Sequence, residues 1–206
     1  MFPQSIQNLI NQLSKLPDIG PRAATRLVFH LINQNQNELE NLSQSLKELK
    51  SKIKLCPDCF SLTNDNLCSI CSDKKRDKNT ICLIETVLNI PLIEKTRQYT
   101  GLYHILGGLI SPGNGTGPED LKIKELINRV KNNSIKEIIF ALSPTTEGDT
   151  TTLYIEKILQ ELKTQPSPKA PAGKVKTSRL GRGLSVGSDL EYIDENTLSN
   201  AFRSRR

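Results

Sequence analysis

The sequence is short of large apolar side chains. Of its 206 residues, 36% are hydrophobic and 4% are aromatic, with one Met and no Trp. A single large core needs more apolar mass than this, so we expect small modules in series, in one or two domains. No uninterrupted apolar run approaches the length of about 18 residues that a transmembrane helix requires, which excludes such a helix.

Targeting signals are also missing from the start of the chain. Residues 1–11 show neither a positively charged region followed by an apolar stretch nor an Arg-rich amphipathic pattern. The first is typical of secretory leaders and the second of organelle-targeting segments. We therefore expect a cytoplasmic protein that has no membrane contact.

Acidic residues are outnumbered by basic ones, with 22 Asp and Glu against 28 Lys and Arg, a net charge of +6. The excess lies at the ends. Residues 1–55 carry seven basic and four acidic side chains and residues 166–206 carry eight and four, whereas the middle is close to neutral. If the protein binds nucleic acid, the ends are where phosphate contacts are expected. We interpret the arginines among the last four residues as a frayed basic tail.

Four of the five cysteines follow the pattern C-x2-C-x8-C-x2-C. Cys56 and Cys59 form the first pair, and Cys68 and Cys71 form the second. Two thiolate pairs on tight turns can surround one tetrahedral zinc ion. Two disulfides or free thiols are the alternatives, and a reducing compartment disfavours the disulfides. Because four thiolates leave no open coordination position, we expect a structural zinc finger at residues 55–78.

The first 54 residues are predicted to be helical. A first helix with apolar residues at helical spacing ends at Pro17, Gly20 permits a tight turn, and Pro21 suits the start of a second helix. A helix start reached through a short hairpin is a good phosphate site, and Arg22 and Arg26 lie on one face beside it. The pattern resembles a helix-hairpin-helix, which binds the DNA backbone without reading its sequence. An ordinary helical hairpin with solvated arginines is the alternative.

A third amphipathic helix is predicted between the hairpin and the cysteines. Its apolar residues recur in steps of three and four. The helix leads straight into the first cysteine pair, so we expect it to orient the zinc module. The residues of this stripe are Leu39, Leu42, Leu46, Leu49 and Ile53.

From residue 81 onward the pattern alternates between strands and helices, which implies a parallel sheet in an α/β fold. It predicts strands at 81–84, 102–106 and 138–142, and helices that run up to about residue 98, over 120–130 and over 151–162. An extended Pro-rich connector follows at 164–173.

Three carboxylates follow the predicted strands, where sites form in parallel sheets. Glu85 comes directly after the first strand, and Glu147 and Asp149 come after the third. Together they could hold Mg²⁺. The alternative is that Glu147 and Asp149 simply favour the positive end of a helix dipole.

The helical hairpin, the four cysteines and the α/β half, in this order, resemble the RecR family of bacterial recombination mediators. The resemblance covers nearly the whole chain apart from the connector. It implies a Toprim domain, as in topoisomerases and primases, over 79–180 and a C-terminal helical segment over 181–206. The matching stretches are 16–31, the four cysteines, 103–108, 117–120, 144–149 and 183–192.

The resemblance also bears on catalysis. Catalytic Toprim domains carry a Glu after the first strand and Asp-x-Asp after the third. Glu85 matches the Glu, but Ser143, Pro144 and Thr145 stand where Asp-x-Asp would be. Phosphoryl transfer assisted by Mg²⁺ needs several ligands on the metal. The family likeness therefore implies a non-enzymatic protein, in which the remaining carboxylates are a vestigial Mg²⁺ site or a partner site.

The partners implied by the resemblance are RecO, in many bacteria RecF, and DNA, both single- and double-stranded. Family members help to load the recombinase onto single-stranded DNA that is coated by single-strand-binding protein. They assemble as homo-oligomers, dimers or tetrameric rings, and here Arg22 and Arg26 would contact DNA at the bacterial nucleoid. Two other functions stay open: a Mg²⁺-dependent Toprim nuclease or topoisomerase-like enzyme, and a zinc-ribbon scaffold that binds RNA.

Overall fold

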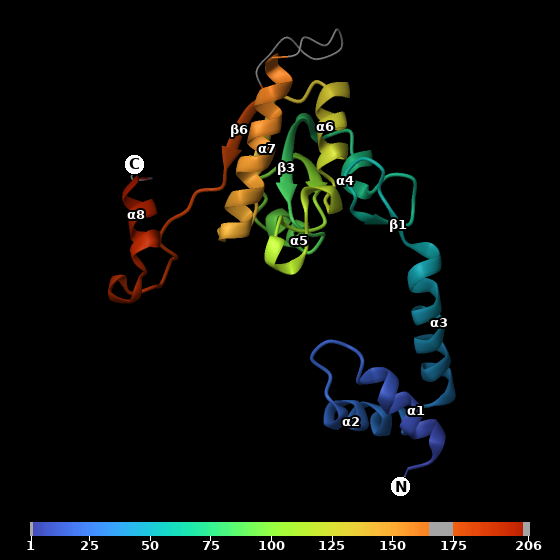
Figure 1. Cartoon of the computed structure of the whole chain (residues 1–206). Coiled ribbons are helices and arrows are strands. Elements are labelled where there is room, and N and C mark those ends of the chain that lie inside the picture. The colour runs from blue at the N-terminus through green and yellow to red at the C-terminus, as the bar shows by residue number, and fades with distance from the viewer. Residues whose placement is uncertain (1, 165–174, 204–206) are drawn as a thin grey trace. The chain divides into compact units, whose positions relative to one another are not determined.

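The structure is a computed structural model that describes residues 2–164 and 175–203. The chain divides into two compact units, Met1–Ile53 and Lys54–Arg206, and many of their elements are labelled in Figure 1. Within the described residues, no helix combines the length and the apolar character that crossing a membrane requires.

The first unit consists of three helices: α1 (Gln4–Leu13), α2 (Pro21–Ile32) and α3 (Gln36–Lys52). The first two pack against each other and form the small core of the unit. Its fully buried members are Ile10, Ala24 and Val28, with Ile6, Leu13 and Ile19 partly buried around them.

The turn between α1 and α2 differs from the expectation at one residue. Gly20 is extended, with φ of −77°, and it is Asp18 that adopts the left-handed conformation, with φ of 62°. Aspartate tolerates this region because its short polar side chain can bond locally. Proline fits the start of α2 as predicted, since Pro21 is the first helical residue and needs no N–H partner there.

The third helix keeps its predicted amphipathic pattern but buries none of its residues. Asn35 caps it by accepting a hydrogen bond of 2.9 Å from the backbone N–H of Glu38. Because the apolar stripe is exposed, a role in orienting the zinc module stays a prediction. Its exposed members are Leu42, Leu46, Leu49 and Ile53.

The second unit is built on a parallel sheet with the strand order β4-β3-β5-β6. The predicted strands are present as β3 (Asp77–Ile84), β4 (Gly101–Ile105) and β5 (Glu137–Phe140). The prediction of three strands was wrong in number, because β6 (Lys176–Arg179) adds a fourth beside β5. Its sequence, Lys-Thr-Ser-Arg, contains no apolar residue and gives no hydrophobic signal.

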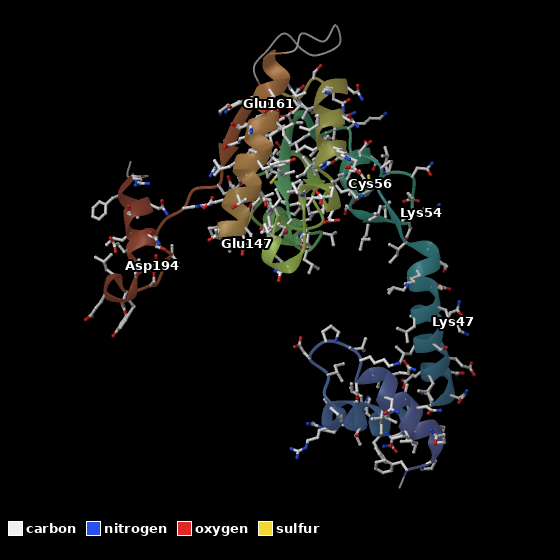
Figure 2. All side chains as sticks on the ribbon, viewed as in Figure 1. Lys47, Lys54, Cys56, Glu147, Glu161 and Asp194 are labelled. Atoms are coloured by element: carbon white, nitrogen blue, oxygen red, sulfur yellow. The ribbon has the colours of Figure 1, made fainter. Side chains whose placement is uncertain are left out.

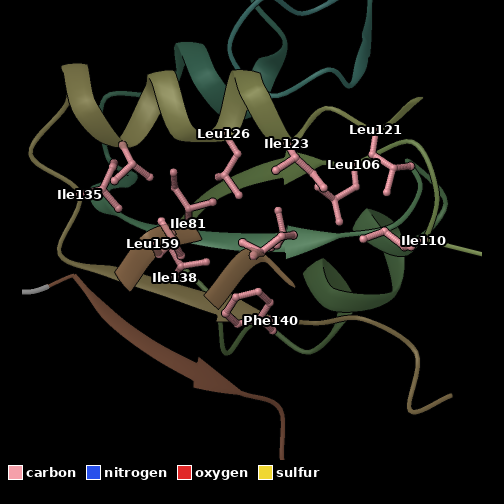
Figure 3. Packing of buried hydrophobic residues seen from close by; sticks show 13 residues of the cluster. Ile81, Leu106, Ile110, Leu121, Ile123, Leu126, Ile135, Ile138, Phe140 and Leu159 are labelled. Carbon is pink, nitrogen blue, oxygen red and sulfur yellow. The ribbon is translucent and has the colours of Figure 1, made fainter. Parts of the chain in front are cut away.

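Helices cover both faces of this sheet. Side chains alternate along a strand, so Ile81 and Leu83 of β3 join the core beneath α6 (Ile123–Asn132) and α7 (Thr146–Thr164). Figure 3 shows this core, with Leu126 of α6 above the sheet. Cys82 and Ile84 of β3 face the opposite side, where they pack with Ile90 of α5 (Asn89–Lys95) and with the zinc module.

Several helix boundaries differ from the predictions. The helix expected over 120–130 is α6, which spans Ile123–Asn132. The helix after β3 was expected to reach about residue 98, but α5 ends at Lys95. The helix after β5 starts at Thr146 rather than 151, so Glu147 and Asp149 lie in its first turn. Most of the Pro-rich connector lies outside the described residues.

Small elements complete the unit. The cysteine segment contains the hairpin of β1 (Lys54–Leu55) and β2 (Leu62–Thr63) and one turn of helix, α4 (Ser69–Ser72). The predicted C-terminal helical segment contains a 3-10 turn, Leu190–Tyr192, and α8 (Glu195–Arg203).

Candidate functional site

The four cysteines of the finger form a metal-binding group. All four are buried, and their sulfur atoms lie within 4.8 Å of one another. The Sγ atoms of Cys59 and Cys68 are 3.5 Å apart, and in a tetrahedral site with Zn–S bonds of about 2.3 Å that edge measures about 3.8 Å. No cysteine is in a disulfide. The thiols therefore fit a zinc ion that Cys56, Cys59, Cys68 and Cys71 would hold.

Hydrogen bonding and burial give these thiols different pKa values. A hydrogen bond from the Cys71 thiol lowers the pKa of Cys59 to about 6, whereas burial raises the pKa of Cys68 to about 11. Zinc binds thiolates, so its binding must displace the remaining protons. A closed set of four sulfur ligands gives the metal a structural rather than a catalytic role.

The zinc module is attached to edge strand β4 of the sheet. The backbone N–H of Ile105 donates to the carbonyl oxygen of Cys59 at 3.0 Å. The ring of Phe60 packs edge-on against His104, with centroids 5.3 Å apart, and the ammonium of Lys122 lies 5.7 Å from the centre of the same ring. The module thereby shields a strand edge that would otherwise be open to pairing.

The helix-hairpin-helix candidate presents an exposed basic face. Arg22 and Arg26 are both exposed on α2, and neither takes part in an ion pair with another described residue. The helix starts without a side-chain cap at Gly20. The first backbone N–H groups of α2, those of Arg22 and Ala23, therefore have no intrahelical acceptor and can bind an anion.

The three carboxylates at the carboxyl edge of the sheet are not gathered into one group. Among the described residues, the four cysteines are the only set of at least three possible ligands that lies this close together. The carboxylate of Glu85 instead accepts a hydrogen bond from the backbone N–H of Ser143. Glu147 is exposed in the first turn of α7.

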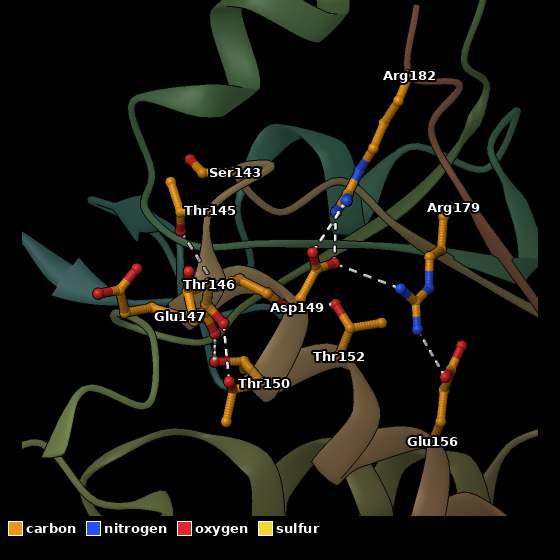
Figure 4. A network of polar contacts seen from close by, with 12 residues as sticks. Ser143, Thr145, Thr146, Glu147, Asp149, Thr150, Thr152, Glu156, Arg179 and Arg182 are labelled. Atoms are coloured by element: carbon orange, nitrogen blue, oxygen red, sulfur yellow. Dashed lines mark hydrogen bonds and ion pairs between the residues drawn. The ribbon is translucent and has the colours of Figure 1, made fainter. Parts of the chain in front are cut away.

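Asp149 is held by two arginines, Arg179 at the end of β6 and Arg182 just after it (Figure 4). The guanidinium of Arg182 donates to both carboxylate oxygens, at 2.9 and 2.5 Å. Arg179 lies 3.4 Å from the same carboxylate and bonds Glu156 at 2.8 Å. The Arg182 guanidinium keeps the pKa of Asp149 below its ordinary value. Glu147 and Asp149 lie in the first turn of α7, the position that the helix-dipole alternative requires. The pairing of Asp149 with two arginines was not predicted.

The two arginines were missed by sequence reasoning. Arg179 ends a strand that has no apolar residue and Arg182 follows it, so nothing in the sequence pattern placed them at the carboxyl edge of the sheet. The one available signal was the position of Arg182 between Gly181 and Gly183, directly before the segment that matches the family pattern.

Comparison with known proteins matches three parts of the chain to family models. Residues 6–50 match the family model "RecR, helix-hairpin-helix", residues 79–169 match "Toprim domain", and residues 183–206 match "RecR, C-terminal". A protein of Rippkaea orientalis named "Recombination protein RecR" is 43% identical over 206 residues, which is 100% of this chain and 98% of that protein. The chain belongs to the RecR family. The predicted family likeness is thus confirmed.

Other RecR proteins agree over the same length. The RecR of Amoebophilus asiaticus is 46% identical over 200 residues, 97% of this chain and 94% of that protein. The RecR of Rubrobacter xylanophilus is 43% identical over 205 residues, 100% of this chain and 98% of that protein. The RecR helix-hairpin-helix model spans α1, α2 and most of α3, and the Toprim model covers β3 to α7, so the expected modules lie in the expected order.

Proposed function

We propose that this protein is a non-enzymatic, DNA-binding recombination mediator in recombinational DNA repair, acting in the bacterial cytoplasm at the nucleoid. The observation that carries the proposal is the basic face of α2, in the segment that matches the RecR helix-hairpin-helix model. There, Arg22 and Arg26 form no ion pair with another described residue and lie beside backbone N–H groups that have no intrahelical acceptor. Such a site binds phosphates rather than base edges, so binding is independent of DNA sequence.

We also propose that the protein is not an enzyme, and the reason lies at the carboxyl edge of the sheet in the Toprim domain, here called the Toprim edge. A Mg²⁺-dependent nuclease needs several metal ligands, and Ser143 and Thr145 occupy the positions of the two aspartates. Glu85 and Asp149 already have partners within the chain. A Toprim nuclease or topoisomerase-like enzyme is the second candidate, and the position of Glu85 is what favours it. No Mg²⁺ role is needed for the mediator.

The proposed partners are RecO, and in some settings RecF, together with further copies of the chain. Large apolar side chains of the first unit are exposed on α2 and α3, more than a monomeric surface needs. They support assembly into a dimer or a tetrameric ring. The Toprim edge, which carries Glu147 and Asp149 but no strong basic excess, suits a protein partner better than phosphates.

A salt titration of DNA binding tests the proposal. We would measure fluorescence anisotropy with single- and double-stranded DNA for the wild type, for Arg22→Ala/Arg26→Ala, and for the control Lys47→Ala/Lys50→Ala on α3. Each lost phosphate contact should lower the slope of log affinity against log salt by about 0.9 on duplex and about 0.7 on single strands. We expect the arginine variant to lose about two such contacts.

The opposite result would contradict the assignment of the hairpin. Equal affinities and salt slopes for the arginine variant and the wild type would show that α2 does not contact DNA. A competition titration with RNA of the same length separates the mediator from an RNA-binding scaffold, because a scaffold would prefer RNA.

A further inference from the structure

The C-terminal segment is tied to the Toprim unit at Arg182. Backbone pairing to the sheet ends at Leu180, whose N–H donates to Phe140 O at 3.2 Å. The next polar attachment is the double hydrogen bond from Arg182 to Asp149. Beyond it, in the part of the chain that the structure describes, the hydrogen bonds of residues 183–203 all stay within that segment.

The residues after Arg182 bury little of their apolar surface. Val186 is fully exposed and Tyr192 is 83% exposed, which leaves the segment without a hydrophobic anchor of its own. The remaining exposed apolar side chains of the segment are Leu184, Leu190 and Phe202. The Arg182–Asp149 pair is thus the last contact that fixes where the segment leaves the sheet.

Two glycines flank Arg182 in the chain. A Cβ added to either Gly181 or Gly183 would meet no atom within 4 Å. Glycine is therefore not required for space at these positions. Its effect is conformational freedom of the backbone on both sides of the arginine.

The Arg182–Asp149 pair has bidentate geometry and is accessible to solvent. Both carboxylate oxygens of Asp149 are engaged, which is the favoured arrangement of guanidinium and carboxylate. The side chains of Arg182 and Asp149 are 35% and 38% exposed, respectively. A pair at this depth contributes modestly, and another cation can reach the same carboxylate from outside. Glu147, exposed in the same helical turn, offers a second acceptor.

We propose that Arg182 is a displaceable latch. A protein partner that presents an arginine or lysine to Asp149 and Glu147 replaces the Arg182 guanidinium and releases the segment from Gly183 onward. The inference rests on the proposed function insofar as that function places protein contacts at the Toprim edge. Binding at this edge and freedom of the C-terminal segment would then be coupled, because both compete for one carboxylate.

Hydrogen exchange of the full-length protein tests the latch without any partner. Asp149→Asn and Arg182→Gln should each accelerate amide exchange in residues 183–203 by about fivefold, the factor expected for an exposed ion pair. The matched control, Glu156→Gln, removes only the Arg179 contact and should leave exchange unchanged. The charge exchange Asp149→Arg/Arg182→Asp should restore slow exchange. Wild-type exchange rates in Asp149→Asn would overturn the latch.

Binding to RecO from the same organism tests the competition. Arg182→Gln removes the internal competitor, so its affinity for RecO should rise about fivefold, whereas Asp149→Asn should bind more weakly than the wild type. Equal affinity of the wild type and Arg182→Gln would overturn the displacement. If RecO bound no variant at all, the proposed partner contact would fail, and with it the displacement, while hydrogen exchange would still decide whether Arg182 fixes the segment.

Discussion

At the scale of single residues, burial changes the protonation of His104 in the second unit. The side chain is fully buried, its Nε2 lies 2.8 Å from the carbonyl oxygen of Lys122, and its Nδ1 has no described partner. The carbonyl fixes the proton on Nε2. A second proton on Nδ1 would have no acceptor, and burial lowers the pKa of His104 to about 4.

The protein should therefore lose stability as the pH falls from 7 to 5. In the unfolded chain His104 has its ordinary pKa of about 6.5, so that state takes up the proton first and is favoured as the pH drops. The stabilisation is fully present above pH 6.5 and lost progressively down to about pH 4, by on the order of 3 kcal/mol.

Urea unfolding at a series of pH values measures this loss. His104→Gln keeps a donor for the Lys122 carbonyl and should flatten the pH dependence between 7 and 5. The carboxylates whose pKa is lowered, such as Asp149, lose their contribution only at lower pH. An equal slope for the variant and the wild type over this interval would show that another group is responsible.

At the scale of elements, the zinc finger and strand β4 form one structural pair. The Ile105 N–H bonds Cys59 O, and Phe60 and Ile70 of the finger pack against the buried cluster on that face of the sheet. The finger has too small a core to fold without its metal. Loss of zinc is therefore expected to open the edge strand as well as the finger.

Chelation of zinc should make the amide of Ile105 exchange rapidly and lower the melting temperature. Elemental analysis should find one zinc ion per chain in the wild type and less in Cys68→Ser. The matched control is Cys82→Ala, which removes the cysteine that lies outside the finger and should keep the metal. Full zinc content in Cys68→Ser, or unchanged exchange at Ile105 after metal loss, would contradict this description of the finger.

Elements were predictable from sequence where hydrophobicity repeats. Apolar runs predicted β3, β4 and β5, and the cysteine spacing predicted the metal-binding group. Strand β6 could not be predicted, because an edge strand of polar residues is specified by its pairing with β5 and not by its own side chains. The contact between Arg182 and Asp149 likewise depends on that strand bringing two distant segments together.

At the scale of the whole molecule, the first unit combines a small core with an exposed apolar surface. Its core contains three fully buried side chains, whereas the apolar stripe of α3 is exposed. Surfaces of this kind are normally covered by another chain. We therefore propose that the first unit lies at a contact between copies of the chain, in addition to its proposed contact with DNA.

Mass measurement in solution should give a multiple of the 23.0 kDa chain mass. Leu46→Lys on the exposed stripe should shift the population toward smaller species, while Lys47→Ala beside it should not. A four-subunit species that persists on DNA would support a tetrameric ring that encloses the DNA. A strict monomer, both with and without DNA, would contradict assembly.

The most direct test of a non-enzymatic mediator is recombinase loading onto single-stranded DNA coated by single-strand-binding protein, in the presence of RecO. We expect the wild type and Glu85→Gln to accelerate filament formation equally, and Arg22→Ala/Arg26→Ala not to accelerate it. We also expect no Mg²⁺-dependent nicking by any of the three proteins. Loss of loading in Glu85→Gln together with nicking by the wild type would contradict a non-enzymatic mediator and establish the Toprim nuclease instead.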